Sequence, residues 1–479
     1  MPLDDFSSDQ DMRAMLQRQR AAHDMAGAPT AGERIDRLER AIDVLVTNRK
    51  AFNEAMNADY GHRSADAGDL TDIAASIGAL KHAKANVRKW MRPERRKSQA
   101  PLGLLGASSR VENQPKGVVG IVSPWNFPVN LTFSPLAGIF AAGNRAMVKP
   151  SEFTEATSEL MRETIAAAFD ETELAVFPGG PERGAAFTSL PFDHLIFTGA
   201  TSIARHVMRA AADNLVPLTL ELGGKSPVIL GRSANFEKAA KRIMAGKTLN
   251  AGQICLAPDY AFAPNDKLDE FVGHAKASVE AMYPSGLKDN DDYTSIVNQR
   301  HYDRLQSYVT DAREKGAEIV ELNPTGDDFS QQQHYKIPPT LVLNPTDEMT
   351  VMQDEIFGPI LPIKTYQETS EAVSYINQND RPLGLYYFGA DAREEREVLR
   401  MTTSGGVTVN DVIMHVGQED LPFGGIGPSG MGSYHGYEGF LEFTHRKAVY
   451  RQTGSELVKM IRPPYGNTFR KQMNAQIKK

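Results

Sequence analysis

Gly117-Val118-Val119-Gly120-Ile121-Val122 is the stretch of this sequence that decides the fold. It is a compact apolar run, which is typical of a parallel strand buried on both faces. Two similar runs follow, Ala146-Met147-Val148-Lys149 and His194-Leu195-Ile196-Phe197. Helical stretches are expected between and after these runs, around residues 134–142, 154–169 and 201–213. This β-α-β rhythm favours a doubly wound nucleotide-binding sheet.

The pattern extends outward in both directions from this sheet. Residues 8–60 and 68–93 have apolar positions at helical spacing, and residues 97–115 read as a hairpin or an excursion from the core. A second α/β series is predicted downstream, with strands at 226–230, 260–263, 317–321, 360–366, 385–388 and 406–409. The chain has 479 residues, which is long for a single core, so two or three domains are expected.

Composition excludes several classes of protein. The chain has 53 basic and 60 acidic residues, a formal charge of −7, and no large basic block, which argues against nucleic acid as a partner. No apolar run is long enough to span a bilayer, and no signal peptide is visible, so we expect no membrane association and a cytoplasmic location. The 11 histidines include no pair at metal-ligand spacing, so no metal site is predicted.

The chain has a single cysteine, Cys255, in the segment Asn250-Ala251-Gly252-Gln253-Ile254-Cys255. A lone thiol cannot form an internal disulfide. In a turn that contains glycine a thiolate can approach a substrate closely and act as a nucleophile. The alternative is an inert buried thiol, which is the usual state of an arbitrary lone cysteine.

Seven motifs along the chain favour the nucleophile. They occur in this order: Pro124-Trp125-Asn126-Phe127-Pro128, Lys149-Pro150-Ser151-Glu152, Phe197-Thr198-Gly199, Leu220-Glu221-Leu222-Gly223-Gly224-Lys225, Gly252-Gln253-Ile254-Cys255, Glu355-Ile356-Phe357-Gly358-Pro359 and Pro422-Phe423-Gly424-Gly425. Together they resemble the aldehyde dehydrogenase superfamily. The segment from Cys255 to Tyr260 resembles its class-3 branch, and within that branch the chain is similar to the bacterial coniferyl aldehyde dehydrogenases.

The resemblance implies an α/β fold of three parts. A Rossmann-like cofactor domain would comprise residues 1–96 and 116–221, and an α/β catalytic domain residues 222–412. A small β oligomerisation region with the C-terminal tail would comprise residues 97–115 and 440–479. Exposed strands of this region would pair with a second copy, so a homodimer is implied, with a tetramer as the alternative.

Three residues are predicted to perform the chemistry. The resemblance implies that Cys255 attacks the aldehyde carbon, giving a thiohemiacetal and then a thioester that water hydrolyses. Asn126 would donate a hydrogen bond to the oxyanion, together with the main-chain N–H of Cys255. Glu221 ends an apolar run before Gly223 and Gly224, where burial favours a raised pKa, and it is the predicted general base.

NAD is the expected cofactor, with NADP as an alternative. Lys149 and Glu152 follow a strand, where open α/β sheets bind ligands, and the resemblance places them on the adenosine ribose. The other residues predicted to bind the cofactor are Gly199 and Thr201 at a helix N-terminus, Glu355 and Phe357 at the nicotinamide ribose and ring, and Trp125. Ala204 stands where the family usually has glycine.

The predicted reaction is oxidation of an aromatic aldehyde, such as coniferaldehyde to ferulate. A planar conjugated substrate requires a flat apolar tunnel, for which Trp125, Phe127 and Tyr60 are candidate walls. Three alternatives remain open at this stage. They are a medium-chain aliphatic aldehyde as the substrate, transfer of the thioester to coenzyme A, and a noncatalytic binding protein on the same fold.

Overall fold

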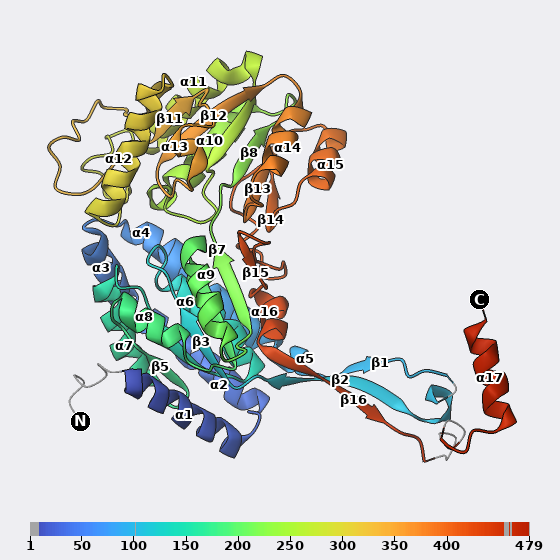
Figure 1. Cartoon of the computed structure of the whole chain (residues 1–479). Helices are drawn as coiled ribbons and strands as arrows, with labels where there is room; N and C mark the ends of the chain where they lie inside the picture. Colours follow the sequence, from blue (N-terminus) through green and yellow to red (C-terminus); the bar gives the residue numbers. More distant parts are fainter. Residues whose placement is uncertain (1–8, 101, 455–458, 460–461, 479) are drawn as a thin grey trace.

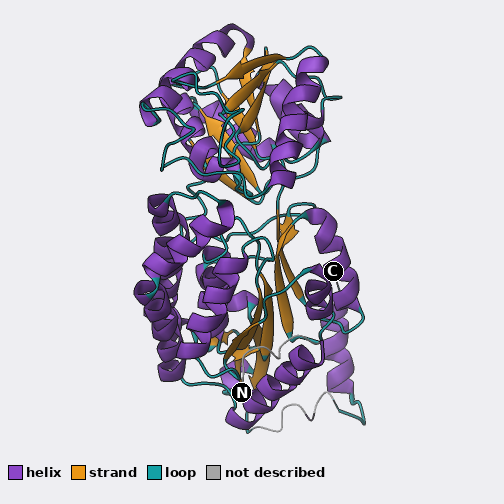
Figure 2. Cartoon of the chain, turned by 90° about the vertical axis from the view of Figure 1, so that its left-hand side faces the viewer, coloured by secondary structure: helices purple, strands orange, loops and turns teal. Residues whose placement is uncertain are grey.

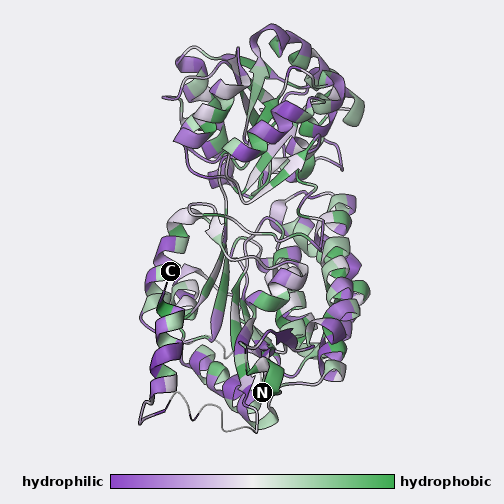
Figure 3. Cartoon of the chain, turned by 90° about the vertical axis from the view of Figure 1, so that its right-hand side faces the viewer, coloured by the Kyte–Doolittle hydropathy of each residue, from purple (hydrophilic) through white to green (hydrophobic). Residues whose placement is uncertain are grey.

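The computed structural model describes residues 9–100, 102–454, 459 and 462–478. Two α/β units lie one above the other, and an arm of three strands projects from the lower unit (Figure 1). Each unit has a central sheet flanked by helices (Figure 2). Hydrophobic residues concentrate on the strands and on the inner faces of the helices (Figure 3).

The lower unit contains the sheet that the opening run predicts. Its six strands have the order β15-β7-β6-β3-β4-β5, and all are parallel except β15. The strands are β3 (Val118–Val122), β4 (Arg145–Lys149), β5 (Leu174–Val176), β6 (His194–Gly199), β7 (Leu218–Leu222) and β15 (Gly430–Met431). The connections run to β4 and β5 on one side of β3 and to β6 and β7 on the other, so the strand order reverses at β3. Ligands bind at such a switch point in open α/β sheets.

Helices pack on both faces of this sheet. They are α1 (Asp9–Ala26), α2 (Ala31–Thr47), α3 (Arg49–Tyr60), α4 (Ala65–Gly68), α5 (Ala75–Trp90), α6 (Asn130–Ala142), α7 (Glu155–Ala168), α8 (Pro181–Thr188), α9 (Thr201–Ala212) and α16 (Gly436–Glu442). Helix α6 is apolar on all sides and is buried along nearly its whole length, as expected for a helix enclosed by a large core. Its position matters for the site because the loop before it, residues 123–129, follows β3.

The upper unit has seven strands in the order β10-β11-β12-β9-β8-β13-β14, parallel except for β10. The strands are β8 (Pro227–Leu230), β9 (Tyr260–Pro264), β10 (Glu318–Glu321), β11 (Thr340–Leu343), β12 (Ile360–Tyr366), β13 (Gly384–Phe388) and β14 (Gly406–Val409). The helices are α10 (Phe236–Thr248), α11 (Leu268–Met282), α12 (Gln299–Glu314), α13 (Thr350–Gln353), α14 (Thr369–Gln378) and α15 (Ala392–Met401).

The arm is an antiparallel sheet with the order β1-β2-β16, formed by Glu94–Arg96, Ser108–Pro115 and Thr444–Arg451. Helix α17 (Asn467–Ile477) lies at the far end of the arm (Figure 1). Phe440 and Phe443 precede β16 and are buried in the core of the lower unit. The division into three domains stays a prediction. Among the described residues, no helix is both long and apolar enough to cross a membrane.

Most predicted elements are present, with two kinds of difference. The helix expected at 68–93 starts at Ala65 and ends at Trp90, and residues Asp69–Ala74 form a π-helical turn inside it. The sequence analysis did not predict the short strands β5 and β11, which have three and four residues.

Candidate active site

The loop that carries Cys255 follows α10 and has an unusual backbone. Asn250, Ala251 and Gly252 have φ angles of 49°, 52° and 73°, which is the left-handed region. A Cβ at Gly252 would lie 2.3 Å from the main-chain oxygen of Gly358, so only glycine fits there. Left-handed conformations of residues other than glycine cost about 1–2 kcal/mol each and persist only where the surroundings hold them.

The side chain of Gln253 provides that restraint. It is fully buried, and its Nε2 donates to the main-chain oxygens of Asn250 and Ser295, both 3.0 Å away. Its Oε1 accepts from the N–H of Val297 at 3.0 Å. The loop is thereby fixed to the segment before α12, and Cys255 is presented half-buried at its end.

Glu221 lies in β7, between Thr198 of β6 and Gly430 of β15. The side chain is buried, and neither carboxylate oxygen has a hydrogen-bond partner in the part of the chain that the structure describes. Burial, with a smaller contribution from the charge of Glu442, raises the pKa of Glu221 well above its ordinary value. Glu221 is thus a buried carboxyl with a raised pKa, and its role as the general base stays a prediction.

Asn126 follows β3 and is buried. Its Nδ2 donates to the main-chain oxygen of Gln253 at 3.2 Å, two residues before Cys255. An amide nitrogen has two N–H groups, so one remains for a ligand.

One cavity of about 220 Å³ brings these three side chains together. Seven of the ten predicted site residues line it, namely Cys255, Glu221, Asn126, Trp125, Gly199, Glu355 and Phe357. The rings of Trp125 and Phe357 meet edge to face, with centroids 5.4 Å apart. The arrangement places a thiol, an amide donor and a carboxyl around one space, which suits attack on a carbonyl carbon.

The electrostatics of this cavity disfavour a free thiolate. Burial raises the pKa of Cys255 to about 12, and the nearby charges of Glu355 and Glu221 add to the effect. Burial also raises the pKa of Glu355 to about 7. A proton acceptor is therefore needed to make Cys255 nucleophilic near neutral pH.

The segment with Glu355 and Phe357 is held by a partly buried ion pair between Lys225 and Asp259. Lys225 Nζ lies 2.5 Å from Asp259 Oδ2 and also donates to the main-chain oxygen of Asp354 at 2.7 Å. Asp259 Oδ1 accepts from the N–H of Ile356 at 2.9 Å. The ion pair thereby fixes the positions of Glu355 and Phe357 relative to Cys255.

The other three predicted residues, Lys149, Glu152 and Thr201, do not line this cavity. Lys149 ends β4, and its buried Nζ donates to the main-chain oxygen of Pro150 at 2.6 Å. Burial lowers the pKa of Lys149, and the charge of Glu152 opposes this shift. Thr201 is the first residue of α9, and its hydroxyl donates to the main-chain oxygen of Pro428 at 3.1 Å.

The N-terminus of α9 and the backbone at Gly223 suit a bound dinucleotide. Helix α9 has no side chain capping its N-terminus, so its first N–H groups are available to an anion such as a pyrophosphate. A Cβ at Gly223 would lie 2.1 Å from Glu355 Oε2, so the backbone there closely approaches a carboxylate suited to ribose hydroxyls. Ala204, in place of the family's glycine, is buried against the core behind this helix. No group of three or more His, Cys, Asp or Glu among the described residues is placed to hold a metal ion.

The sequence analysis missed several lining residues. His301 and Arg304 reach the cavity from α12, and Leu131 from α6. Helix α12 is rich in charged residues, and nothing in the sequence distinguishes His301 and Arg304 from neighbours that face solvent. Of the three candidate wall aromatics, Trp125 lines the cavity, whereas Tyr60 and Phe127 do not. Tyr60 is buried and donates to the main-chain oxygens of Trp125 and Asn126, at 3.0 and 3.1 Å.

Comparison with known proteins identifies the family of the chain. Residues 5–449 match the aldehyde dehydrogenase family. The chain is 62% identical to a probable coniferyl aldehyde dehydrogenase of Caulobacter vibrioides, over 98% of this chain and 97% of that protein. It is 54% identical to a coniferyl aldehyde dehydrogenase of Pseudomonas sp. strain HR199, over 95% and 94% of the two chains. The substrate-bound structure of Staphylococcus aureus AldH superposes with a TM-score of 0.90 at 34% identity, over 97% of this chain and 99% of that one.

Proposed function

Because the chain belongs to the aldehyde dehydrogenase family, we propose that it oxidises conjugated aromatic aldehydes to carboxylic acids with NAD(P), with coniferaldehyde oxidised to ferulate as the leading reaction. The observation that supports this most directly is that Cys255, Asn126 and Glu221 line one and the same cavity of about 220 Å³. An inert thiol would not require an unpartnered buried carboxyl and an amide donor on the same space.

Cys255 is the nucleophile. Glu221 takes the proton of its thiol, directly or through water, and the sulfur adds to the aldehyde carbon. The charge that forms on the aldehyde oxygen receives hydrogen bonds from the Asn126 amide and from the main-chain N–H of Cys255. Such donors act strongly because they are already oriented when the charge forms.

The cofactor is held by residues on both units. Lys149 and Glu152 bind the adenosine ribose, the N-terminus of α9 with Gly199 and Thr201 binds the pyrophosphate, and Glu355, Phe357 and Trp125 surround the nicotinamide side. When bound, NAD(P) accepts the hydride that leaves the tetrahedral carbon.

Glu221 acts a second time after it has passed the thiol proton to solvent through water in the cavity. After the hydride has left, Cys255 carries the acyl group as a thioester. Glu221 removes a proton from a water molecule, which attacks the thioester carbon. The carbon–sulfur bond then breaks, the proton on Glu221 returns to the departing sulfur, and the carboxylic acid and the free thiol result. Burial without a hydrogen-bond partner leaves this carboxyl free to exchange protons with ligands of the cavity.

The aromatic substrate is supported by the names of the relatives and by the cavity wall. Trp125, Phe357 and Leu131 supply flat or apolar surface beside Cys255. A medium-chain aliphatic aldehyde is the alternative, and the similar proteins do not favour it. NAD is proposed over NADP because the Glu152 carboxylate would repel a 2′-phosphate.

A homodimer is the proposed assembly, with a tetramer as the alternative. In the arm, β16 pairs with β2 along one edge only, so its other edge offers unpaired main-chain groups to a second copy. Light scattering of the purified protein tests this assembly. The cytoplasmic location stays a prediction.

The deciding experiment compares kcat/KM for coniferaldehyde, benzaldehyde, hexanal and acetaldehyde with each cofactor. We expect coniferaldehyde and benzaldehyde to exceed acetaldehyde by at least about tenfold, or about 1.4 kcal/mol of transition-state binding. Equal values for acetaldehyde and the aromatic substrates would reject the aromatic assignment while leaving the aldehyde dehydrogenase activity intact.

A further inference from the structure

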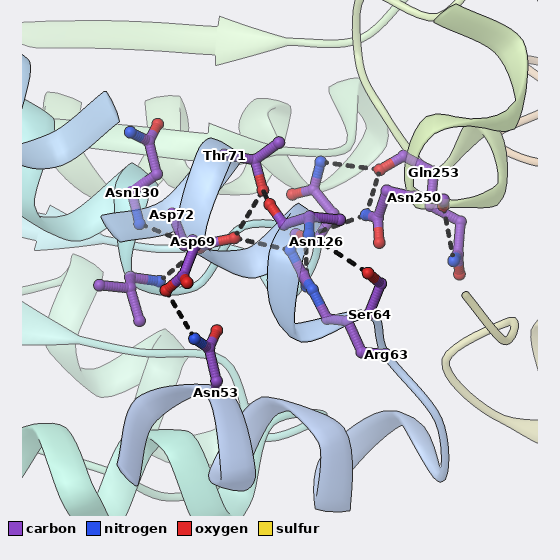
Figure 4. Close-up of polar contacts among 12 residues, drawn as sticks. Asn53, Arg63, Ser64, Asp69, Thr71, Asp72, Asn126, Asn130, Asn250 and Gln253 are labelled. Carbon is purple, nitrogen blue, oxygen red and sulfur yellow. Dashed lines mark hydrogen bonds and ion pairs between the residues drawn. The ribbon is translucent and has the colours of Figure 1, made fainter. Parts of the chain in front are cut away.

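A buried arginine contacts the main chain of Asn126. Arg63 lies between α3 and α4, and its side chain is 2% exposed. Its Nη1 donates to the main-chain oxygen of Asn126 at 2.9 Å, and its Nη2 donates to Asp72 Oδ2 at 2.6 Å (Figure 4). The guanidinium carbon lies 4.8 Å from the centroid of the Tyr60 ring. The group is therefore held by charge on one side and by an aromatic face on another.

Asp72 binds both Arg63 and the N-terminus of α6. It lies on the π-helical turn Asp69–Ala74 and is fully buried. While Oδ2 accepts from Arg63, Oδ1 accepts from the N–H groups of Val129 and Asn130, each at 3.2 Å. The Asp72 carboxylate thus binds both Arg63 and the first residues of α6. Asn126 lies on the loop that leads into α6, and Arg63 contacts its main chain. π-helical turns are rare and are frequent at functional sites.

The main-chain oxygen of Asn126 accepts two further hydrogen bonds. Tyr60 donates from its hydroxyl at 3.1 Å, and Asn250 donates from Nδ2 at 3.1 Å. A carbonyl oxygen has two lone pairs, so three donors, two from the end of α3 and the turn after it and one from the loop before Cys255, leave this peptide group little freedom. A fixed peptide group restrains the direction in which the Asn126 side chain leaves the main chain, and the hydrogen bond from its Nδ2 to the main-chain oxygen of Gln253 then holds the amide itself.

We propose that Arg63, held by Asp72, is a positioning residue that orients the amide of Asn126 toward the oxyanion. The proposal rests on the proposed function, because it presupposes that Asn126 donates to the charge on the aldehyde oxygen. A buried ion pair is weak evidence for a gain in stability, since an apolar pair of similar size is often as stable. Because Arg63 contacts the main chain of Asn126, we infer that it serves to hold Asn126 in place rather than to stabilise the fold. Displacements of about 1 Å in such sites can lower rates about 100-fold.

The test measures the single-turnover rate of hydride transfer at saturating coniferaldehyde and cofactor, with Asn126→Ala as the reference. We expect Asn126→Ala to lose about 100- to 1000-fold in this rate. We expect Arg63→Lys to lose between about 10- and 100-fold, with cofactor affinity, measured by fluorescence titration, within about twofold of the parent. In the Asn126→Ala background, Arg63→Lys should lose less than about twofold further, because a residue that acts through Asn126 has nothing left to position.

The chain offers a matched control in Arg37. Its Nε lies 2.9 Å from Glu173 Oε1, and its Nη1 donates to the main-chain oxygen of Asn144 at 3.2 Å. This guanidinium also bridges a carboxylate and the carbonyl of an asparagine, but it does not reach the cavity. Arg37→Lys should therefore leave the hydride-transfer rate unchanged.

The outcomes separate two failures. If Asn126→Ala itself leaves hydride transfer unchanged, the proposed role of Asn126 fails, and this inference fails with it. If Asn126→Ala is slow but Arg63→Lys matches Arg37→Lys, or lowers the rate equally in both backgrounds, only the inference fails. Should Arg63→Lys not fold, the double variant Arg63→Met/Asp72→Asn, which removes both charges, takes its place with the same expected losses and the same outcomes.

Discussion

The side-chain amide of Asn126 donates to the main-chain oxygen of Gln253, with 3.2 Å between nitrogen and oxygen. Asn126 follows β3 of the lower unit, whereas Gln253 stands two residues before Cys255, between α10 and β9 of the upper unit. The bond therefore joins the loop after β3 to the loop that carries the candidate nucleophile. A substitution at either residue is therefore expected to alter the position of the Cys255 thiol.

Cys255→Ala should abolish aldehyde oxidation, because no other thiol exists to form the acyl intermediate. Formation of the reduced cofactor, followed by absorbance, measures the loss. Cofactor affinity should be unchanged, since the substitution removes one sulfur atom from the cavity wall. Turnover within about tenfold of the parent, or about 1.4 kcal/mol of barrier, would contradict covalent catalysis by this residue.

The thiol of Cys255 should react with iodoacetamide at a rate that keeps rising from pH 7 to pH 10. Only the thiolate reacts, and its pKa is raised to about 12, first by burial and then by the charge of Glu355. Mass spectrometry of the alkylated protein measures the rate. Glu355→Gln removes one of the opposing charges, so it should speed alkylation at pH 8. A rate that levels off below pH 8 would show that the thiol is already ionised there.

Glu221→Gln should separate the two halves of the reaction. Water activation requires a proton acceptor, and glutamine has none, so hydrolysis of the thioester should become limiting. A burst of reduced cofactor, up to one equivalent per site, should precede a still slower steady state in stopped-flow traces. The burst should be slower than that of the parent, because Glu221 also takes the proton of the Cys255 thiol. Steady-state turnover equal to that of the parent at neutral pH would rule out this role.

The same substitution should change how stability depends on pH. Glu221 binds its proton more tightly in the folded protein than in the unfolded chain, because burial raises its pKa. Between those two pKa values the folded state binds more protons, so stability falls as pH rises. Glu221→Gln removes this dependence on pH. The melting temperature of the variant minus that of the parent should therefore increase from pH 5 to pH 8. A constant difference across this range would mean that Glu221 is ionised in the folded protein.

Glu152→Gln should improve the use of NADP. The exposed Glu152 carboxylate lies just beyond β4 and near Lys149, where it would repel a 2′-phosphate. The ratio of kcat/KM for NADP to that for NAD should increase by about tenfold, or about 1.4 kcal/mol. Glu163→Gln, an exposed position on α7, serves as the matched control. An equal ratio in both variants would place the 2′-hydroxyl away from Glu152.

The sequence by itself determined the alternating α/β pattern and the residues with the chemistry. Strands β12 and β14 begin and end at the predicted residues. Most of β12 is buried, and a buried strand is written largely as a continuous apolar run, whereas β14 is a partly buried strand at the edge of the sheet. Cys255, Glu221 and Asn126 could likewise be picked out, since each stands in a short motif whose residues are adjacent along the chain. The cavity they share confirms that these motifs meet, while their catalytic roles stay predictions.

Only the tertiary structure decided what surrounds them. The contacts of Arg63 and Asp72 with the loop of Asn126 join positions more than 50 residues apart, and His301 and Arg304 reach the cavity from a helix of the other unit. Charged residues usually face water, so nothing in the local sequence indicates that Arg63 and Asp72 are buried or that His301 and Arg304 line a cavity. Such contacts depend on how complete elements pack against one another, whereas local sequence patterns report only the period and polarity of each element.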